Sequence, residues 1–387
     1  MGEAPRVHWS EGGEARSARW RSERGAAPPK KIVIADDTMT ADDAYGLASQ
    51  GVGLLWRGDF QNARQMLTAL AHRADRPPRK PGKTRPAAVP KQMSPVEAFN
   101  AYRQSRAQRA RTLGMLLIPL EADYTIPLRR APDMKQACSE AYGPGEDASL
   151  VSLRELQGLV GAHEWRRKGI ELEAFNLRVH PHYGVFAPVR SEYVDLVSKA
   201  PLPASVARSS VAFDIGTGTG VLAAVLARRG IRRVVATDMD PRALACAREN
   251  IERFALAKQV QVVEEDLFPE GRAALVVCNP PWIPARPSSP LEHGIYDPES
   301  RMLRGFLRGL PAHLEPGGEG WLILSDLAEH LGLRTRQELV DAIEGAALKV
   351  VERIDMRPSH PRAADASDPL HHARTAEVTS LWRLAAA

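Results

Sequence analysis

Residues 211–220, VAFDIGTGTG, join a short apolar segment to a turn with three glycines, Gly216, Gly218 and Gly220. An apolar run of this length is typical of a buried strand. Glycine adopts the left-handed conformations that a tight turn between a strand and a helix requires. The spacing is GxGxG, whereas GxGxxG is typical of dinucleotide sites. We therefore expect a strand, a turn and a helix that hold a nucleotide-like ligand without a pyrophosphate.

Downstream of this turn, strand-length apolar segments alternate with helical patterns. The alternation predicts an α/β fold with a doubly wound, mostly parallel, Rossmann-like sheet of seven strands and a ligand at the strands' carboxyl ends. The last two strands have no predicted helix between them, so we expect the last strand to be antiparallel. Strands are predicted at 211–215, 233–237, 260–263, 274–278, 321–324, 348–355 and 376–384, and helices at 221–229, 241–254, 298–314 and 335–347.

The chain upstream of this sheet is predicted to be a mainly helical N-terminal module, divided by its composition. The start is polar and rich in Arg, Gly and Glu, which is typical of disorder. Residues 94–97, SPVE, form a capping box with proline at the first helical position. The predicted divisions are a disordered tail (1–31), a small helical segment (32–75), a linker rich in Pro, Lys and Arg (76–92), a substrate-recognition module (93–205) and the sheet domain (206–387).

The cysteine positions and the distribution of apolar residues limit which classes of protein this sequence can belong to. Cys138, Cys246 and Cys278 are far apart and form no CxxC pair, so neither a disulfide framework nor a metal site is expected. Neither a signal-peptide pattern nor a run of about 18 apolar residues is present. We expect a cytoplasmic protein without membrane contact.

The basic excess of the chain lies upstream. Residues 1–207 contain 30 Lys or Arg and 23 Asp or Glu, whereas the remainder contains 22 and 24. The basic residues of 76–111 are a candidate contact for nucleic acid, and a stiff, solvated spacer is the alternative interpretation.

Acidic residues follow the next two predicted strands. Asp238, in ATDMDP (236–241), lies about 20 residues after the glycines, where a carboxylate can accept both hydroxyls of a ribose. Asp266, in EEDLF (264–268), can accept the amino hydrogens of an adenine, to which Leu267 offers a backbone amide.

The segment NPPW (279–282) follows the fourth strand and indicates the reaction. Two prolines there force the chain to turn. The Asn279 side-chain oxygen and the Pro280 carbonyl can each accept one N–H of a planar amide or amine. These two acceptors would align the nitrogen with an electrophilic methyl group. The reaction would then depend on positioning and electrostatic preorganisation rather than on a strong base. Trp282 can stack on the planar group.

Together, DIGTGTGVLA, ATDMDPRALACAREN, EEDLF and NPPW resemble the motifs of class I S-adenosylmethionine-dependent methyltransferases. They are most similar to the glutamine N5-methyltransferases of release factors and a ribosomal protein. The resemblance covers about 180–330 and includes GVFAPVRSE at 184–192, although the family usually has Tyr at the position of Trp282. It implies S-adenosylmethionine as the cofactor, bound by Gly216, Gly218, Gly220, Asp238 and Asp266, with Asn279, Pro280 and Trp282 holding the substrate amide.

The same segments add further site candidates. These are Asp214, Thr217, Met239, Leu267 and Asn279 for cofactor binding and Pro281 for the catalytic turn.

The favoured methyl acceptor is a glutamine side chain in a translation factor or ribosomal protein, recognised by the upstream module. The alternative is adenine N6 or guanine N2 of RNA or DNA, since these are also planar amino nitrogens. A small-molecule acceptor and a cofactor-sensing module without turnover are further hypotheses, and the intact 279–282 segment argues against the latter.

Overall fold

A computed structural model describes residues 5–76, 93–189, 191–287, 290–358 and 368–387. The chain divides into two units, Met1–Glu164 and Trp165–Ala387. Among the described residues, no helix combines the length and the apolar character that crossing a membrane requires.

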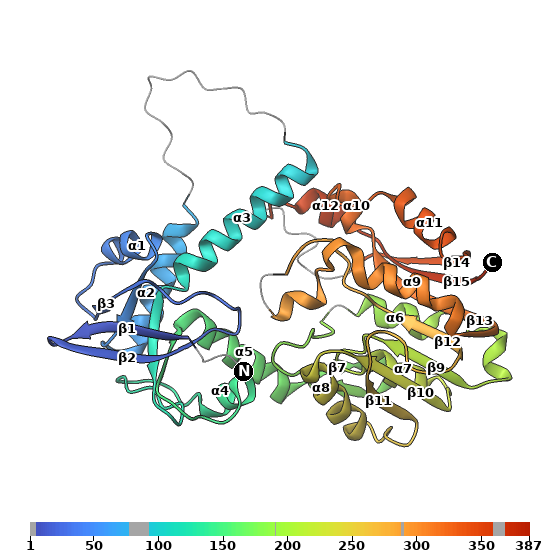
Figure 1. The fold of residues 1–387 in the computed structure, drawn as a ribbon, viewed down its shortest axis with the longest axis horizontal. Coiled ribbons are helices and arrows are strands. Elements are labelled where there is room, and N and C mark those ends of the chain that lie inside the picture. The colour runs from blue at the N-terminus through green and yellow to red at the C-terminus, as the bar shows by residue number, and fades with distance from the viewer. Residues whose placement is uncertain (1–4, 77–92, 190, 288–289, 359–367) are drawn as a thin grey trace. The chain divides into compact units, whose positions relative to one another are not determined.

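The C-terminal unit is built on a seven-stranded sheet in the order β11-β10-β9-β12-β13-β15-β14 (Figure 1). β15 pairs antiparallel with both β13 and β14, and the other pairs are parallel. This arrangement confirms the predicted doubly wound fold with its antiparallel last strand. The strands are β9 (Val211–Ile215), β10 (Arg233–Asp238), β11 (Val260–Glu264), β12 (Ala273–Cys278), β13 (Leu314–Ser325), β14 (Leu348–Met356) and β15 (Thr379–Ala386).

Helices cover both faces of this sheet, and a hairpin precedes it. A short helix, α12, intervenes between β14 and β15, where the sequence predicted none, yet the two strands still pair antiparallel. The helices are α6 (Glu192–Lys199), α7 (Val221–Arg228), α8 (Pro241–Arg253), α9 (Arg301–His313), α10 (Leu327–His330), α11 (Arg336–Glu344) and α12 (His371–Ala376), and the hairpin is β7 (Ile170–Leu172) with β8 (Leu177–Val179).

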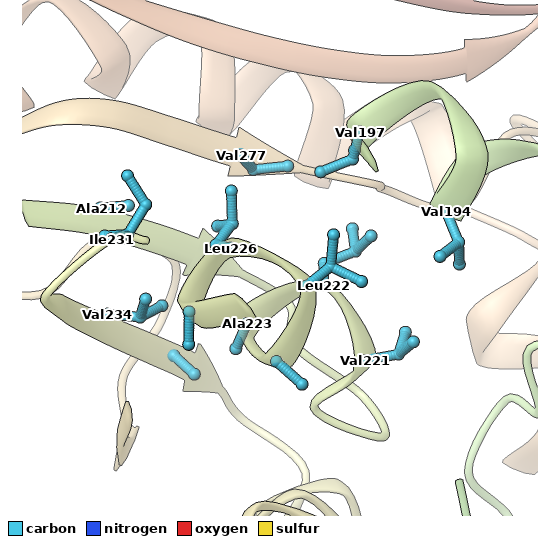
Figure 2. Close-up of a cluster of buried hydrophobic side chains, with 14 of the residues drawn as sticks. Val194, Val197, Ala212, Val221, Leu222, Ala223, Leu226, Ile231, Val234 and Val277 are labelled. Carbon is cyan, nitrogen blue, oxygen red and sulfur yellow. The ribbon is translucent and has the colours of Figure 1, made fainter. Parts of the chain in front are cut away.

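Alternation along the strands separates two cores. Leu275 and Val277 of β12 belong to a cluster with α6 and α7. Val276 and Cys278 belong to the opposite cluster, with α9 and α11. Figure 2 shows the first cluster, in which Leu222 and Leu226 of α7 lie among valines and alanines of the strands. Burying each such leucine contributes about 1.5–3 kcal/mol, so these clusters hold the sheet edge that carries the site in place.

The boundary between the units lies earlier than predicted. The sequence placed it between 93–205 and 206–387, but the structure places it after Glu164. Leu172, Val179 and Val197 pack into the same cluster as α7, so the hairpin and α6 are part of the sheet unit.

The N-terminal unit contains a six-stranded mixed sheet, β1-β2-β6-β5-β4-β3, which corrects the prediction of a mainly helical module. The strands are β1 (Arg6–Glu11), β2 (Glu14–Arg21), β3 (Lys31–Ala35), β4 (Val52–Trp56), β5 (Leu116–Leu120) and β6 (Ser149–Ser152). The helices are α1 (Ala41–Ser49), α2 (Phe60–Ala74), α3 (Pro95–Leu113), α4 (Lys135–Tyr142) and α5 (Leu153–Lys168), and the last turn of α5 lies beyond the boundary after Glu164.

The prediction of a disordered tail over 1–31 is wrong for the part that the structure describes. Val7 and Trp20, on β1 and β2, pack with Leu55, Leu117 and Leu150 from three other strands. Because these partners are distant in sequence, the polar local composition does not reveal the contacts.

The segment 32–75 is also not purely helical. Leu54 and Leu55 fall within the predicted helical segment, but they lie on β4, whose five residues are all buried. A fully buried strand shows no alternation, so its apolar run also matches helical spacing. The capping box of Ser94 and Glu97 is present at the start of α3. Residues 77–92 of the predicted linker lie outside the described residues.

All three cysteines are free and buried. Burial raises the pKa of the Cys138 thiol to about 11 and that of the Cys246 thiol to about 12. Burial also raises the pKa of Cys278 well above its usual value.

Candidate active site

The glycine turn joins β9 to α7, and its conformation requires glycine. Gly216 and Gly218 have φ values of 71° and 55°. A Cβ on Gly216 would lie 2.5 Å from the Cε of Met302, so a methionine of α9 lies directly against the turn. A Cβ on Gly218 would have no neighbour within 4 Å, so backbone conformation alone favours glycine there and the space beside it is open. The Thr217 amide donates to the Thr237 carbonyl at 2.8 Å, which ties the turn to β10.

Asp214 stabilises the glycine turn from a buried position. Its side chain is 1% exposed, and its Oδ2 accepts the Thr217 hydroxyl at 2.6 Å and the Ala223 amide at 3.0 Å. Burial raises the pKa of Asp214 to about 6. The structure thus shows a carboxylate that holds the turn to α7.

Asp238, at the end of β10, faces the same turn. Its Oδ2 accepts the Gly218 amide at 2.9 Å, and its Oδ1 accepts the Asp240 amide at 3.0 Å. Burial raises its pKa. A carboxylate has about four acceptor positions, so two bonds to the backbone leave capacity for the hydroxyls of a ribose.

The remaining cofactor candidates lie at the same edge of the sheet but differ in their surroundings. Met239 is 56% exposed. Asp266 is exposed and lies 3.5 Å from Arg301. Leu267 has a φ of 78°, and its carbonyl accepts the Thr237 hydroxyl at 2.6 Å. The open space beside Gly218 and the carboxylate of Asp238 at the same turn fit an adenosyl group.

The NPPW segment folds into a turn in which its two outer residues contact each other. The Trp282 indole Nε1–H donates to the Asn279 Oδ1 at 2.9 Å. Trp282 packs against both core clusters, so the indole holds the asparagine from a fixed position. Because a carbonyl oxygen has two lone pairs, this bond leaves Asn279 able to accept one N–H of a substrate.

A buried carboxylate that the sequence analysis missed connects this turn to α9. The Asp297 amide donates to the Ile283 carbonyl at 2.8 Å, and its carboxylate accepts the amides of Met302 and Leu303 at 3.0 and 3.1 Å. Asp297 is 5% exposed, and burial raises its pKa. An Asp-Pro pair ahead of a predicted helix is the signal that could have found it.

The structure therefore gathers the predicted residues at the carboxyl ends of β9, β10, β11 and β12. Asp238 contacts the glycine turn, and Asn279 contacts Trp282. Met302 of α9 joins them through its contact at Gly216. Asp214 lies beneath the turn, and Asp266 lies at the exposed margin.

Comparison with known proteins shows what this unit is similar to. Residues 176–343 match the family model described as Methyltransferase small domain. Release factor glutamine methyltransferase of Cereibacter sphaeroides is 35% identical over 159 residues, 37% of this chain and 55% of that protein. Ribosomal protein L11 methyltransferase of Pelotomaculum thermopropionicum is 40% identical over 144 residues, 36% of this chain and 39% of that protein.

A second release factor glutamine methyltransferase, from Gloeobacter violaceus, is 30% identical over 178 residues, 42% of this chain and 59% of that protein. The chain therefore spans about half the length of the curated relatives that it matches. The family match, the strand order and the four motifs agree with one another: residues 176–343 are similar to S-adenosylmethionine-dependent methyltransferases, and the sheet has the class I fold.

Proposed function

We propose that this protein transfers a methyl group from S-adenosylmethionine to the side-chain amide nitrogen of a glutamine in a translation-related protein. The observation that carries the proposal is the turn of Asn279 and Pro280 at the end of β12, in which Trp282 fixes the asparagine oxygen. The names of the relatives, which include release factor and ribosomal protein methyltransferases, support a protein substrate.

In this proposal the chain binds the cofactor through its backbone and two acids. Asp238 would accept the ribose hydroxyls, Asp266 the adenine amino hydrogens, and Met239 would cover the ring. The cofactor supplies an electrophilic methyl group on a sulfonium.

The proposed acceptor, the amide nitrogen of the substrate glutamine, is a poor nucleophile. An amide nitrogen shares its lone pair with the carbonyl, so it must pyramidalise to attack a methyl group. The Asn279 oxygen and the Pro280 carbonyl would each accept one N–H, which fixes the nitrogen and favours the localised lone pair. Removing one preorganised group of this kind costs about 10²–10³ in rate, and we expect that loss for Asn279→Ala.

One of the basic residues of 76–111, the candidate nucleic-acid contact, pairs with an acid within the protein. Arg109 of α3 pairs with Asp75, with 2.7 Å between Nε and Oδ1. We therefore favour the protein substrate and propose that the N-terminal unit recognises it.

The experiment uses methyl-labelled cofactor and an extract from cells that lack this gene, with Asn279→Ala as the blank. Labelled material is divided between protease and nuclease digestion. We expect the label to be released by protease and to resist nuclease, after which the modified glutamine can be mapped by mass spectrometry. Label released by nuclease would instead assign the activity to an amino group of RNA or DNA.

A further inference from the structure

The formal net charge of the chain lies entirely in the N-terminal unit. Residues 1–164 contain 24 Lys or Arg and 19 Asp or Glu, a balance of +5, whereas residues 165–387 contain 28 of each. α3 contributes to this excess, since it holds four arginines and only one acid. Arg103, Arg106 and Arg109 follow one another at intervals of three residues, so they lie on roughly one face of the helix. A basic excess that is confined to one unit favours an anionic partner for that unit.

A turn after β2 brings a further arginine to the start of α5. Residues 22–25 form this turn, and the Glu23 amide in it donates to the Glu155 carboxylate at 3.0 Å. Glu155 lies in the first turn of α5, directly after Arg154. The bond therefore places Arg24 beside Arg154, although the two are far apart in the sequence.

Arg154 is a half-buried cation among other cations. Burial lowers its pKa to about 10, together with the positive charges of Arg24, Arg109 and Arg106. An arginine remains protonated at neutral pH even so. Its donors reach solvent, because none of its nitrogens is among those that are buried without an acceptor. One turn and two helices thus form an arginine cluster, which consists of Arg24, Arg106, Arg109 and Arg154.

Three acids lie nearby, Asp75, Glu23 and Glu155, but they do not neutralise the arginine cluster. Asp75 pairs with Arg109 at 2.7 Å. Glu155 is 8% exposed and accepts the Tyr142 hydroxyl at 2.7 Å. The charges that the described residues place near the Arg154 guanidinium are those of arginines alone. Within the described residues, neither an ion pair nor a hydrogen bond is formed by the side chains of the other three cations, Arg24, Arg106 and Arg154.

Other arginines of the same unit have acid partners. Arg57 pairs with Glu11 at 2.7 Å, and Arg73 pairs with Asp42 at 2.6 Å. Like charges that face one another without a partner repel, and the repulsion is strongest where a side chain is partly removed from water. An anion that binds across the arginine cluster would relieve this repulsion. The arrangement therefore favours a ligand with several negative charges.

We propose that the arginine cluster binds the phosphate backbone of an RNA. A guanidinium presents two parallel N–H groups that match two oxygens of a phosphate, and the phosphates that recur along a strand can each engage one arginine. The choice of RNA among polyanions rests on the proposed function, since proteins of the translation apparatus work on RNA. RNA is a binding partner in this proposal, and the methyl acceptor stays the glutamine.

The test measures binding of a labelled single-stranded RNA of about 12 nucleotides to the full chain by fluorescence anisotropy, without cofactor and over a range of salt concentrations. We expect Arg154→Gln and Arg106→Gln each to weaken binding about 5-fold at about 0.1 M salt, because one phosphate contact is lost. Each should also reduce the slope of log affinity against log salt by about 0.7. Arg154→Gln should not lower the thermal stability, since its neighbours repel the arginine.

Arg16→Gln is the matched control. It removes the same charge from the same unit, but Arg16 pairs with Glu14 near the start of β2, whereas Arg24 follows the end of that strand. Its affinity for RNA and its salt slope should equal those of wild type. Arg106 is exposed, so Arg106→Gln carries the test if Arg154→Gln does not fold.

A DNA strand of the same sequence and a glutamate-rich peptide of equal charge are the comparison ligands. The proposal is overturned if wild type does not bind the RNA, if either comparison ligand binds more tightly, or if the variants in the arginine cluster bind as tightly as the Arg16 control. Because this assay involves no methyl transfer, it can fail while the labelling experiment succeeds, and the labelling experiment can fail while RNA still binds.

Discussion

Trp282 acts on Asn279 through a single N–H. The amide group of an asparagine can present either its oxygen or its nitrogen to a substrate, and a donor at 2.9 Å from Oδ1 selects one orientation. In the proposed reaction this makes Trp282 a positioning residue as well as a stacking surface.

Trp282→Phe keeps an aromatic ring but removes the donor. We expect kcat to fall about 3–10-fold, the equivalent of one neutral hydrogen bond, with little change in cofactor affinity. Trp321→Phe is the control, because Trp321 also donates its indole N–H, to Glu319 at 3.1 Å, but lies in the core. It should reduce stability and leave kcat nearly unchanged. A Trp282→Phe enzyme with full kcat would show that the N–H does not orient the asparagine.

Asp214 makes stability depend on pH. Its pKa in the folded protein is about 6, above the ordinary value of 3.8, so the folded state binds this proton more tightly than the unfolded chain. The contribution of this group to stability therefore decreases as pH rises from about 4 to 6.

Asp214→Asn removes this titration. The free energy of unfolding of the variant minus that of wild type should increase by about 1.4 kcal/mol from pH 5 to pH 7.5. This change corresponds to one pKa unit. Urea unfolding of cofactor-free protein at the two pH values measures the difference. A gap between variant and wild type that is the same at both pH values would contradict the assigned pKa.

The sequence could predict which residue types the site contains but not all of their contacts. Asp238 and Asn279 could be placed because Asp238 ends an apolar strand and Asn279 directly follows one. The bond of Trp282 depends on a side-chain rotamer, and the link from Ile283 to Asp297 spans a loop, so neither has a local pattern.

At the scale of elements, the first turn of α9 connects the turn of residues 279–282 with the glycine turn of residues 216–220. Asp297 caps the amides of Met302 and Leu303, and Met302 lies against Gly216. Between them, Glu299 and Ser300 have φ values of 57° and 54°, a left-handed conformation that costs about 1–3 kcal/mol per residue. The cap and the helix thus hold a strained bend beside the site.

Asp297→Ala should destabilise the C-terminal unit by about 1–2 kcal/mol through loss of the cap. We also expect cofactor affinity to fall, since Met302 loses its anchor beside the glycine turn. Thr335→Ala, which removes the capping box of α11, provides a helix-cap loss of similar size and should leave cofactor affinity unchanged. Thermal unfolding and calorimetric titration with cofactor measure the two effects, and equal cofactor affinities in both variants would refute the link.

Elements with uninterrupted apolar runs could be predicted to within about two residues, as β9 and β12 show. β13 starts seven residues before its predicted start, because Pro316, Gly317 and Gly318 have the composition of a turn although they lie in the strand. β1 and β2 were missed because most of their exposed positions hold polar or charged residues. The Gly12–Gly13 pair between them, with both φ values positive, is a hairpin signal that could have revealed them.

At the scale of the whole molecule, the division after Glu164 defines the proper truncation. A deletion of residues 1–91 would remove β1 through β4, four of the six strands of the N-terminal sheet. The core clusters on both faces of the seven-stranded sheet lie within Trp165–Ala387, as do all predicted cofactor residues.

The fragment 165–387 should therefore fold and bind S-adenosylmethionine with an affinity within about twofold of the full chain. The same fragment with Asp238→Ala should bind about 10–100-fold more weakly, because charge-assisted bonds contribute about 1.5–3 kcal/mol each. Calorimetry on both fragments checks this. A folded fragment 165–387 without affinity for the cofactor would show that the N-terminal unit contributes to the cofactor site.

The three buried thiols give each unit its own chemical reporter. Cys138 lies in the N-terminal unit, and Cys246 and Cys278 lie in the C-terminal unit. Since only a thiolate reacts readily with alkylating reagents, burial and a raised pKa protect all three in the closed state. The rate at which each cysteine becomes alkylated under native conditions therefore measures how often its own unit opens, without any engineered label.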